Sequence, residues 1–353
     1  MHFQKMKIAV FVFFGYVFHE SNSIMPQTIR KGGNKTVTTE CQRILKENRR
    51  QRTGKKIRRA ARNWELYLFL IPTVAYFLIF RYYPMYGIQI AFRNYKATKG
   101  ITGSAWVGFR NFERFFSATD FMQLLTNTLS VSIGTLLCSF PVPILLALLL
   151  NQAPFRRYKK IVQTVVYAPH FISTVVLVGI ISLFFSPSSG IVNFMLQHLG
   201  QQPIHFMGEP GWFRPLYIGS EIWQNAGWGS ILYLAALSSI NPELHEAAVM
   251  DGANKFQRIW HVDIPGILPT IVIMFILNSG KVMAVGFEKA YLMQTSLNLS
   301  ASEIIATYVY KRGLLQSQFS FSTAVGLFES VANLILILTV NFISKKVTDA
   351  SLF

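Results

Sequence analysis

The stretch EAAVMDGA, residues 246–253, is a short, partly polar run between two long apolar segments. Asn241, just before it, is a candidate helix cap, because its side-chain oxygen can accept an amide proton of the first turn. Pro242 suits the first helical position, and Gly252 suits the C-terminal end. The pattern predicts a helix of about ten residues inside a loop, too short to be stable alone in water. We expect it to dock on membrane helices of the same chain or on a partner, with an unpartnered interfacial helix as the alternative.

The apolar segments indicate a membrane protein with several spans. Hydrophobic residues make up 51% of the 353 positions, and only 14% of the positions are charged. A bilayer core about 30 Å thick requires about 20 mostly apolar residues per helix. Six stretches meet this requirement: residues 64–84, 123–150, 161–186, 217–240, 265–294 and 320–344. The sequence therefore predicts an all-α, polytopic membrane protein with six transmembrane helices.

The distribution of lysine and arginine predicts the orientation in the membrane. Ten of these residues fall within positions 43–62 and four within 151–160, whereas the connections expected on the opposite side carry eight in total. Because basic residues accumulate on the cytoplasmic side, we expect both termini and the loop containing residues 246–253 in the cytoplasm. The same rule accounts for the net charge of +18, so nucleic-acid binding is not expected.

Residues 1–63 are expected to form a basic, partly disordered extension ahead of a transmembrane domain of residues 64–353. The apolar run of this extension, residues 8–18, is too short to span a bilayer. It resembles a signal-peptide core, but cleavage and export would place the ten basic residues outside, against the predicted orientation. Two interpretations remain: an uncleaved surface segment, or a start codon assigned too far upstream, with Met25 as the first residue.

Three short motifs carry a resemblance to a known family. They are Glu246-Ala247-Ala248, Asp251-Gly252-Ala253 and Ile264-Pro265. This spacing resembles the EAA loop of permease subunits of bacterial binding-protein-dependent ABC importers. The longer stretch WQNAGWGSILYLAALSSINPELHEAAVMDGAN, residues 223–254, resembles the carbohydrate-uptake, maltose-permease-like branch. The stretches GKVMAVGFEKAYLM, residues 280–293, and TYVYKRGLL, residues 307–315, together with the C-terminal segment, resemble its complex-saccharide subgroup. The departure is Asp263 with Ile264 before the proline, where the family usually has leucine.

The resemblance implies a type I ABC importer permease fold in the bacterial cytoplasmic membrane. It implies that the short helix contacts an ATPase subunit, through Glu246, Ala247, Ala248, Asp251, Gly252, Ala253 and Pro265. The chain contains no Walker-type phosphate loop, so ATP and magnesium are expected on that separate subunit, with no cofactor on this chain. The implied partners are a second permease subunit, two ATPase subunits, an extracytoplasmic solute-binding protein, membrane lipid and an oligosaccharide substrate.

Polar residues within the fourth and fifth predicted spans are candidates for the substrate pathway. They are Asn225, Trp228, Ser230, Tyr233, Asn278, Ser279 and Lys281. Polar groups inside a membrane often mark function, although hydrogen bonding between helices is the alternative. Lys281 needs an acidic partner, which a uronic-acid-containing saccharide would supply. We expect Glu288 and Lys289 to pair with each other at the outer interface, and His170 to be a hydrogen-bonded packing residue.

Three other classes of protein are alternatives to an oligosaccharide permease. The same architecture could import a different solute, such as a peptide, a polyamine or a polyol. An ion-coupled secondary transporter is the second alternative, but neither an internal repeat nor several acids within the spans support it. Metalloprotease and serine-hydrolase motifs are absent, and Cys41 and Cys138 form neither a disulfide framework nor a metal motif. The chain is therefore expected to be a transport subunit and not an enzyme.

Overall fold

The computed structural model describes residues 64–284 and 286–348, and the extension of residues 1–63 lies outside the described residues. The chain divides into two units, one ending at Arg81 and one beginning at Tyr82. The described part of the first unit consists of α3, Trp64–Phe77, and most of the π-helix η1, Leu78–Tyr82. The second unit begins at Tyr82, the last residue of η1, and continues with the 3-10 helix η2, Tyr83–Phe92, so helical backbone extends eight residues beyond the predicted end of the first span at position 84.

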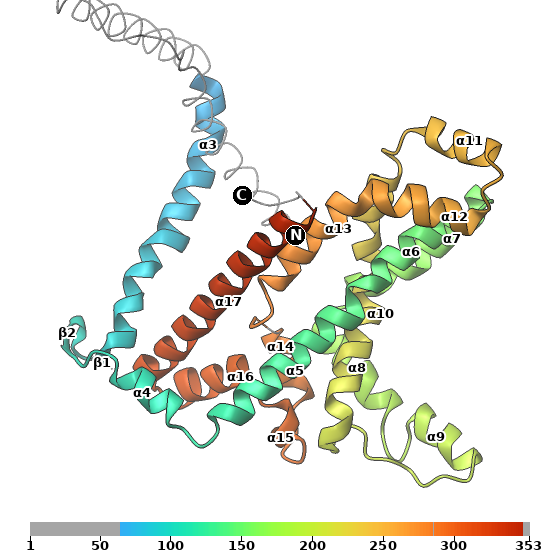
Figure 1. The fold of residues 1–353 in the computed structure, drawn as a ribbon. Helices are drawn as coiled ribbons and strands as arrows, with labels where there is room; N and C mark the ends of the chain where they lie inside the picture. Colours follow the sequence, from blue (N-terminus) through green and yellow to red (C-terminus); the bar gives the residue numbers. More distant parts are fainter. Residues whose placement is uncertain (1–63, 285, 349–353) are drawn as a thin grey trace, which may run out of the picture. The chain divides into compact units, whose positions relative to one another are not determined.

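A small hairpin is the exception to the predicted all-α architecture. Strand β1, Arg93–Lys96, pairs antiparallel with β2, Gly100–Trp106 (Figure 1). Gly100 adopts a φ of +65°, a left-handed conformation that favours glycine and lets the chain reverse over few residues. The short helix α4, Arg110–Phe116, follows.

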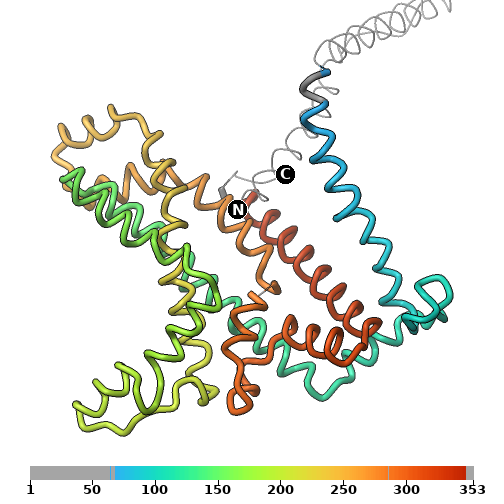
Figure 2. The backbone as a smooth tube through the Cα atoms, turned by 180° about the vertical axis from the view of Figure 1, so that it is seen from behind, coloured from blue at the N-terminus to red at the C-terminus, as the bar shows by residue number. Residues whose placement is uncertain are grey.

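The second predicted span lies in the longest of the candidate membrane helices among the described residues. Helices α5, Phe121–Ser139, and α6, Pro141–Asn151, form one helical stretch of 31 residues, Phe121–Asn151. Pro141 occupies the first turn of α6, where its missing amide proton costs little. Helix α10, Pro210–Leu237, packs along both, and Figures 1 and 2 show it crossing them.

The predicted third span, residues 161–186, is not one continuous helix. Helix α7, Arg156–Tyr167, continues into the 3-10 turn η3, Ala168–Phe171, and α8, Thr174–Phe184, then leaves at an angle of 100°. Pro169 removes an amide donor at this point, and the Ser173 hydroxyl instead accepts a hydrogen bond from the Val176 amide as the cap of α8. The helix α9, Ile191–His198, follows.

The predicted fifth span, residues 265–294, is wrong in its second half. After α11, Pro242–Met250, come α12, Lys255–Arg258, the π-helix η4, Ile259–Asp263, and α13, Ile264–Ser279. The backbone then turns at residues 280–283, before α14, Phe287–Met293. Gly280 lies against Ile337 of the last helix, α17, Phe319–Thr348, at a distance that leaves little room for a side chain.

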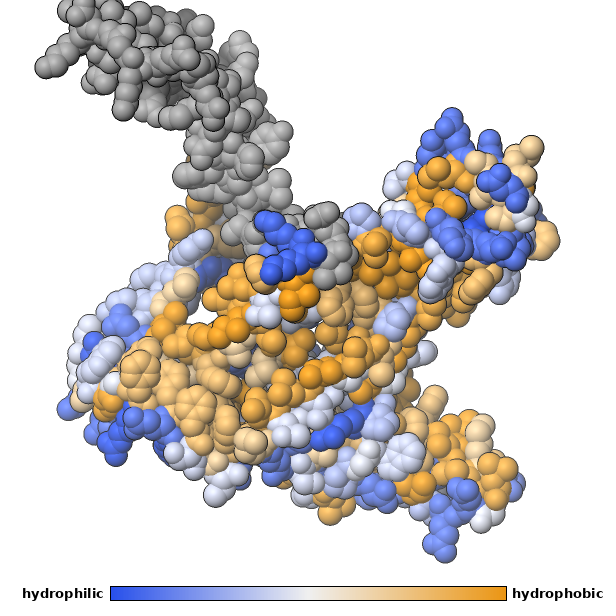
Figure 3. All heavy atoms as spheres, viewed as in Figure 1, coloured by the Kyte–Doolittle hydropathy of each residue, from blue (hydrophilic) through white to orange (hydrophobic). Residues whose placement is uncertain are grey.

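Three clusters of buried residues hold the second unit together. One joins α6, α10 and α13 through Leu148, Leu234 and Ile267. Another joins α5, α16 (Ile305–Tyr310) and α17, and a third joins α5, α8, α10 and α14. Figure 3 shows hydrophobic side chains covering much of the visible outer surface, as expected where helices face lipid.

Among the described residues, four helices are long and apolar enough to cross a membrane. They are Leu68–Phe92, Phe121–Asn151, Lys255–Ser279 and Phe319–Lys346, and the bent pair α7–α8 adds a fifth if it is one span. Helix α10, which contains most of the predicted fourth span, does not meet that test. The count of six spans therefore remains a prediction, as does the location of the termini.

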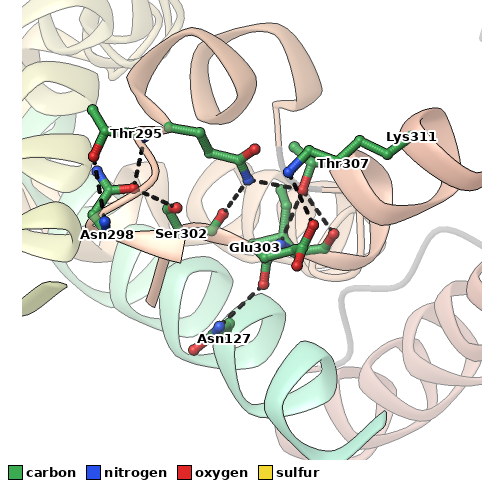
Figure 4. Close-up of polar contacts among 9 residues, drawn as sticks. Asn127, Thr295, Asn298, Ser302, Glu303, Thr307 and Lys311 are labelled. Atoms are coloured by element: carbon green, nitrogen blue, oxygen red, sulfur yellow. Dashed lines mark hydrogen bonds and ion pairs between the residues drawn. The ribbon is translucent and has the colours of Figure 1, made fainter. Parts of the chain in front are cut away.

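Polar side chains fix the segment between α14 and α17, which includes α15, Leu299–Ser302, and the π-helix η5, Lys311–Leu315. The Asn127 amide of α5 donates to the carbonyls of Ser300 and Glu303, at 2.9 and 3.0 Å. Figure 4 shows this network, in which Lys311 also pairs with Glu303 at 3.0 Å. Because these bonds join α5 to residues far along the chain, they hold this segment at one end of the unit.

Helices α7 and α10 approach so closely at Gly227 that one added methyl group should lower the stability of the protein. A Cβ added at Gly227 of α10 would overlap the Val166 carbonyl of α7, so we expect Gly227→Ala to destabilise the protein by about 1–3 kcal/mol. Gly219→Ala on the same helix is the matched control, since nothing lies within 4 Å of its Cβ position. Thermal unfolding of the purified permease measures both. Equal stability of the two variants would contradict this backbone contact.

Candidate functional site

The loop helix predicted from residues 241–252 is confirmed as α11. The Glu243 amide donates a hydrogen bond to the Asn241 side-chain oxygen at 3.1 Å, and Pro242 occupies the first turn. At the other end, the Ala253 amide donates to the Ala248 carbonyl at 2.9 Å and the Gly252 amide donates to the Val249 carbonyl at 3.0 Å. Gly252 has a φ of +78°, as this type of C-terminal cap requires.

Helix α11 buries none of its own side chains. Glu246 and Ala247 are exposed, Ala248 is half-buried, and Met250 is 86% exposed. Beyond the helix, Asp251 is exposed, Ala253 is half-buried, and Pro265 lies in the first turn of α13. Figures 1 and 2 both place α11 at one end of the unit, beside α12 and the start of α7. An exposed short helix with capped ends is available for contact with another protein.

A cavity of about 420 Å³ lies among α5, α6, α10, α13 and the segment after α13 that includes residues 281–284 and 286. Four of the predicted pathway residues line it: Asn225, Tyr233, Asn278 and Lys281. The structure thus brings together residues from the fourth and fifth predicted spans. A hydroxyl, two amides and an ammonium group in one cavity can bind a polyhydroxylated ligand through several hydrogen bonds.

Three predicted pathway residues lie outside the cavity lining. The Ser230 hydroxyl donates to the Gly227 carbonyl at 2.6 Å, and the Ser279 hydroxyl donates to the Phe275 carbonyl at 2.7 Å. Both hydroxyls are therefore bonded within their own helices, the arrangement that local hydrogen bonding favours. Trp228 stacks on the His170 ring with 4.7 Å between the ring centres. The expected packing role of His170 is confirmed, since its Nδ1 also lies 2.9 Å from the Asn225 oxygen.

The predicted pairing of Lys289 with Glu288 is wrong. The Lys289 side chain is 5% exposed, and its ammonium group lies 3.0 Å from the Glu221 carboxylate of α10. It also donates to the Tyr217 carbonyl at 3.1 Å and lies 4.5 Å from the centre of the Tyr217 ring. Glu221 in turn accepts a hydrogen bond from the Asn225 amide at 2.7 Å. No local pattern in the sequence indicates this pair, because its members lie 68 positions apart.

Lys281 differs from Lys289 in having no such partner. Glu221 and Lys281 are the charged side chains of the cavity lining, and Glu221 is engaged by Lys289. The Lys281 side chain is exposed, and none of the ion pairs found within residues 64–284 and 286–348 includes it. The cavity therefore contains one cationic group that is available to a ligand.

The fold and this site define a class of protein. Several helices of membrane-spanning length, a polar cavity among them and an exposed capped helix in one loop are the features of a membrane transport subunit. The chain belongs to the family of binding-protein-dependent transport system inner membrane components, whose sequence pattern matches residues 139–349. It is therefore a multi-pass protein of the cytoplasmic membrane and, like the rest of its family, a transport component without enzymatic activity.

The relatives are permeases of ABC transporters. The chain is 46% identical to protein LplB of Bacillus subtilis (strain 168), over 82% of this chain and 91% of that protein. It is 44% identical, over 82% and 90%, to the polygalacturonan/rhamnogalacturonan transport system permease protein YteP of the same organism. A solved structure of a bacterial alginate ABC transporter, in complex with an alginate pentasaccharide-bound periplasmic protein, contains a similar chain. That chain is 41% identical to this one, with a TM-score of 0.77 over 83% of this chain and 98% of that one. The family resemblance stated from the loop motifs is confirmed.

Proposed function

We propose that this chain is the permease subunit of a binding-protein-dependent ABC importer that moves an oligosaccharide into the cytoplasm. In this proposal a separate ATPase subunit binds ATP and magnesium, and a second permease subunit completes the pathway. The chain has six spans with both termini in the cytoplasm, which places α11 on the side of the ATPases. An extracytoplasmic solute-binding protein delivers the saccharide. Support for this partner comes from the alginate transporter, which was solved in complex with a periplasmic protein that holds an alginate pentasaccharide.

The exposed helix α11 is the observation that carries this proposal. It is capped at both ends, yet none of its side chains is fully buried against its own protein. A helix of nine residues gains little stability by itself, so a partner surface is the natural place for its exposed face. Glu246, Ala247 and Gly252 would carry the coupling to the ATPase, supported by Ala248, Asp251 and Ala253, with Pro265 directing the following span.

The cavity supports an acidic saccharide as the substrate. Its lining combines Asn225, Tyr233 and Asn278, which can exchange hydrogen bonds with sugar hydroxyls, with the cation of Lys281. A carboxylate of a uronic-acid unit would pair with that cation. Two relatives point the same way, since one is named as a polygalacturonan/rhamnogalacturonan permease and the other belongs to an alginate transporter.

Uptake by the complete importer in proteoliposomes tests this substrate. We expect Lys281→Met to lower the uptake of uronic-acid oligosaccharides about 10- to 100-fold, because a charge-assisted hydrogen bond contributes about 1.5–3 kcal/mol. Uptake of a neutral oligosaccharide should change little. Lys99→Met is the matched control, an exposed lysine between the two hairpin strands. Unchanged acidic-substrate uptake by Lys281→Met would remove the uronate from the proposal.

The same preparation separates the two alternative functions. A screen of solutes with the cognate binding protein identifies a peptide, polyamine or polyol importer. Replacement of the Walker lysine in the ATPase subunit should stop uptake, because ATP hydrolysis drives the transport. Uptake that persists in that variant and follows an ion gradient would instead indicate a secondary transporter.

A further inference from the structure

Asp263 lies where three helical elements meet. It is the last residue of η4, immediately before α13, and its side chain is 0% exposed. One carboxylate oxygen accepts a hydrogen bond from the Gln152 amide at 3.0 Å, at the C-terminal end of α6. The other oxygen lies 3.4 Å from Nε2 of His245, which belongs to α11.

A carboxylate is an unexpected group at this position. The surrounding cluster is apolar and includes Ile259, Ile264 and Ile267. Burial of a charge is unfavourable unless partners compensate for the lost water, and an apolar side chain would avoid that cost. The oxygen that faces His245 makes no hydrogen bond within the described residues, so the imidazole and, more weakly, the guanidinium of Arg258 are its compensating neighbours. Asp263 is therefore better explained by the contacts it makes than by packing.

The contacts of Asp263 connect α11 to the cavity. Of the ion pairs among the described residues, the one that involves α11 is His245 with Asp263. Helix α13 begins beside Asp263 and carries Met274 and Asn278 into the cavity lining. Helix α6, which Gln152 ends, carries Pro143 into the same lining. One buried carboxylate thus contacts the exposed helix and both of these cavity-lining helices.

We propose that Asp263 is a positioning residue that transmits displacement of α11 to α6 and α13. The inference rests on the proposed function, because it takes α11 as the contact with the ATPase. Helix α11 has no other ion pair among the described residues and no fully buried side chain, and Gly252 at one of its two chain ends adopts a left-handed turn. Those ends would absorb a displacement of α11 by rotation about their backbone dihedral angles, and the cavity would not respond. The link makes the three elements move together.

The test compares transport with ATP hydrolysis in the reconstituted importer. Asp263→Asn keeps an oxygen that can accept from Gln152 and removes the charge that faces His245. We expect the amount of substrate moved per ATP hydrolysed to fall about tenfold, while hydrolysis stimulated by the loaded binding protein stays within about twofold of the unmodified protein. His245→Ala, at a part-exposed position, should reduce the ratio in the same direction. The double variant should move no less substrate per ATP hydrolysed than Asp263→Asn alone, since both changes break the same link.

Ser238→Ala is the matched control. Ser238 caps the C-terminal end of α10, and its hydroxyl donates only to the Leu234 carbonyl of the same helix. It should transport and hydrolyse normally. A normal transport-to-hydrolysis ratio in both Asp263→Asn and His245→Ala would overturn the inference. Asp263→Asn could instead lose ATP hydrolysis and transport in parallel while His245→Ala leaves both unchanged. That result would also overturn the inference, because it would indicate a purely structural role of Asp263. If the unmodified complex showed no ATP-dependent uptake, the proposed function would fail, and the inference with it.

Discussion

Replacement of Gly252 by proline is expected to abolish uptake. Gly252 has a φ of +78°, whereas the ring of proline fixes φ near −65°, so the turn that ends α11 cannot form. Proline also removes the amide that donates to the Val249 carbonyl at 3.0 Å. Loss of the cap in so short a helix should unwind its last turn or redirect the chain that follows. Uptake of radiolabelled substrate into proteoliposomes measures the effect.

Gly252→Ala separates the backbone conformation from the side chain. No atom lies within 4 Å of an added Cβ, so alanine adds no clash and only the left-handed backbone is unfavourable, by about 1–2 kcal/mol. We expect reduced but measurable uptake from this variant. Membrane insertion and docking of the loaded binding protein should be intact in both variants. Normal uptake by Gly252→Pro would exclude α11 from the transport mechanism.

The second large effect is expected from Glu246→Lys, which should also abolish uptake. Glu246 is exposed on α11, and none of the ion pairs within the described residues includes it. Its carboxylate is therefore available to a basic group of the proposed ATPase partner. Charge reversal would place two like charges in contact, at a cost of several kcal/mol, enough to lower complex formation at least about 100-fold. Co-purification of the ATPase with the permease, followed by uptake, measures this loss.

Glu243→Lys is the matched control for this charge reversal. Glu243 lies one turn earlier on the same helix and is also exposed, and its carboxylate accepts a hydrogen bond from Asn241 at 3.0 Å. Reversal there should weaken the start of α11 by about 0.3–1 kcal/mol and leave the ATPase bound. Equal loss of ATPase binding in the two variants would show that the net charge of the helix matters and that Glu246 has no specific partner.

Local features of the chain could be predicted from the sequence. The caps of α11 depend on Asn241, Pro242 and Gly252, which act on backbone groups within a few positions, so the type of residue is sufficient to identify them. The apolar stretches were likewise recognised from composition, since a span must satisfy its backbone hydrogen bonds internally. Their interruptions were harder to predict. Pro169 and Ser173 together bend the third span by 100°, yet Pro215 lies inside the unbroken helix α10.

The candidate site was predicted only in part. Residues of α10 and α13 were proposed for the pathway from their polarity, and Asn225, Tyr233, Asn278 and Lys281 line one cavity. Polarity alone did not separate these from Ser230 and Ser279, because a serine hydroxyl can bond to its own helix. The direction of each side chain depends on helix rotation, which neighbouring helices determine.

The sequence by itself determined the class of protein, the short capped helix and the family motifs, since these depend on composition and on spacings of a few residues. The tertiary structure decided which distant groups meet. Lys289 pairs with Glu221 across 68 positions, and Asp263 joins Gln152 and His245 inside an apolar cluster. Such contacts form because a buried charge must find a partner wherever the packing of the helices provides one. That packing is a property of the folded chain as a whole, and no local pattern of residues specifies it.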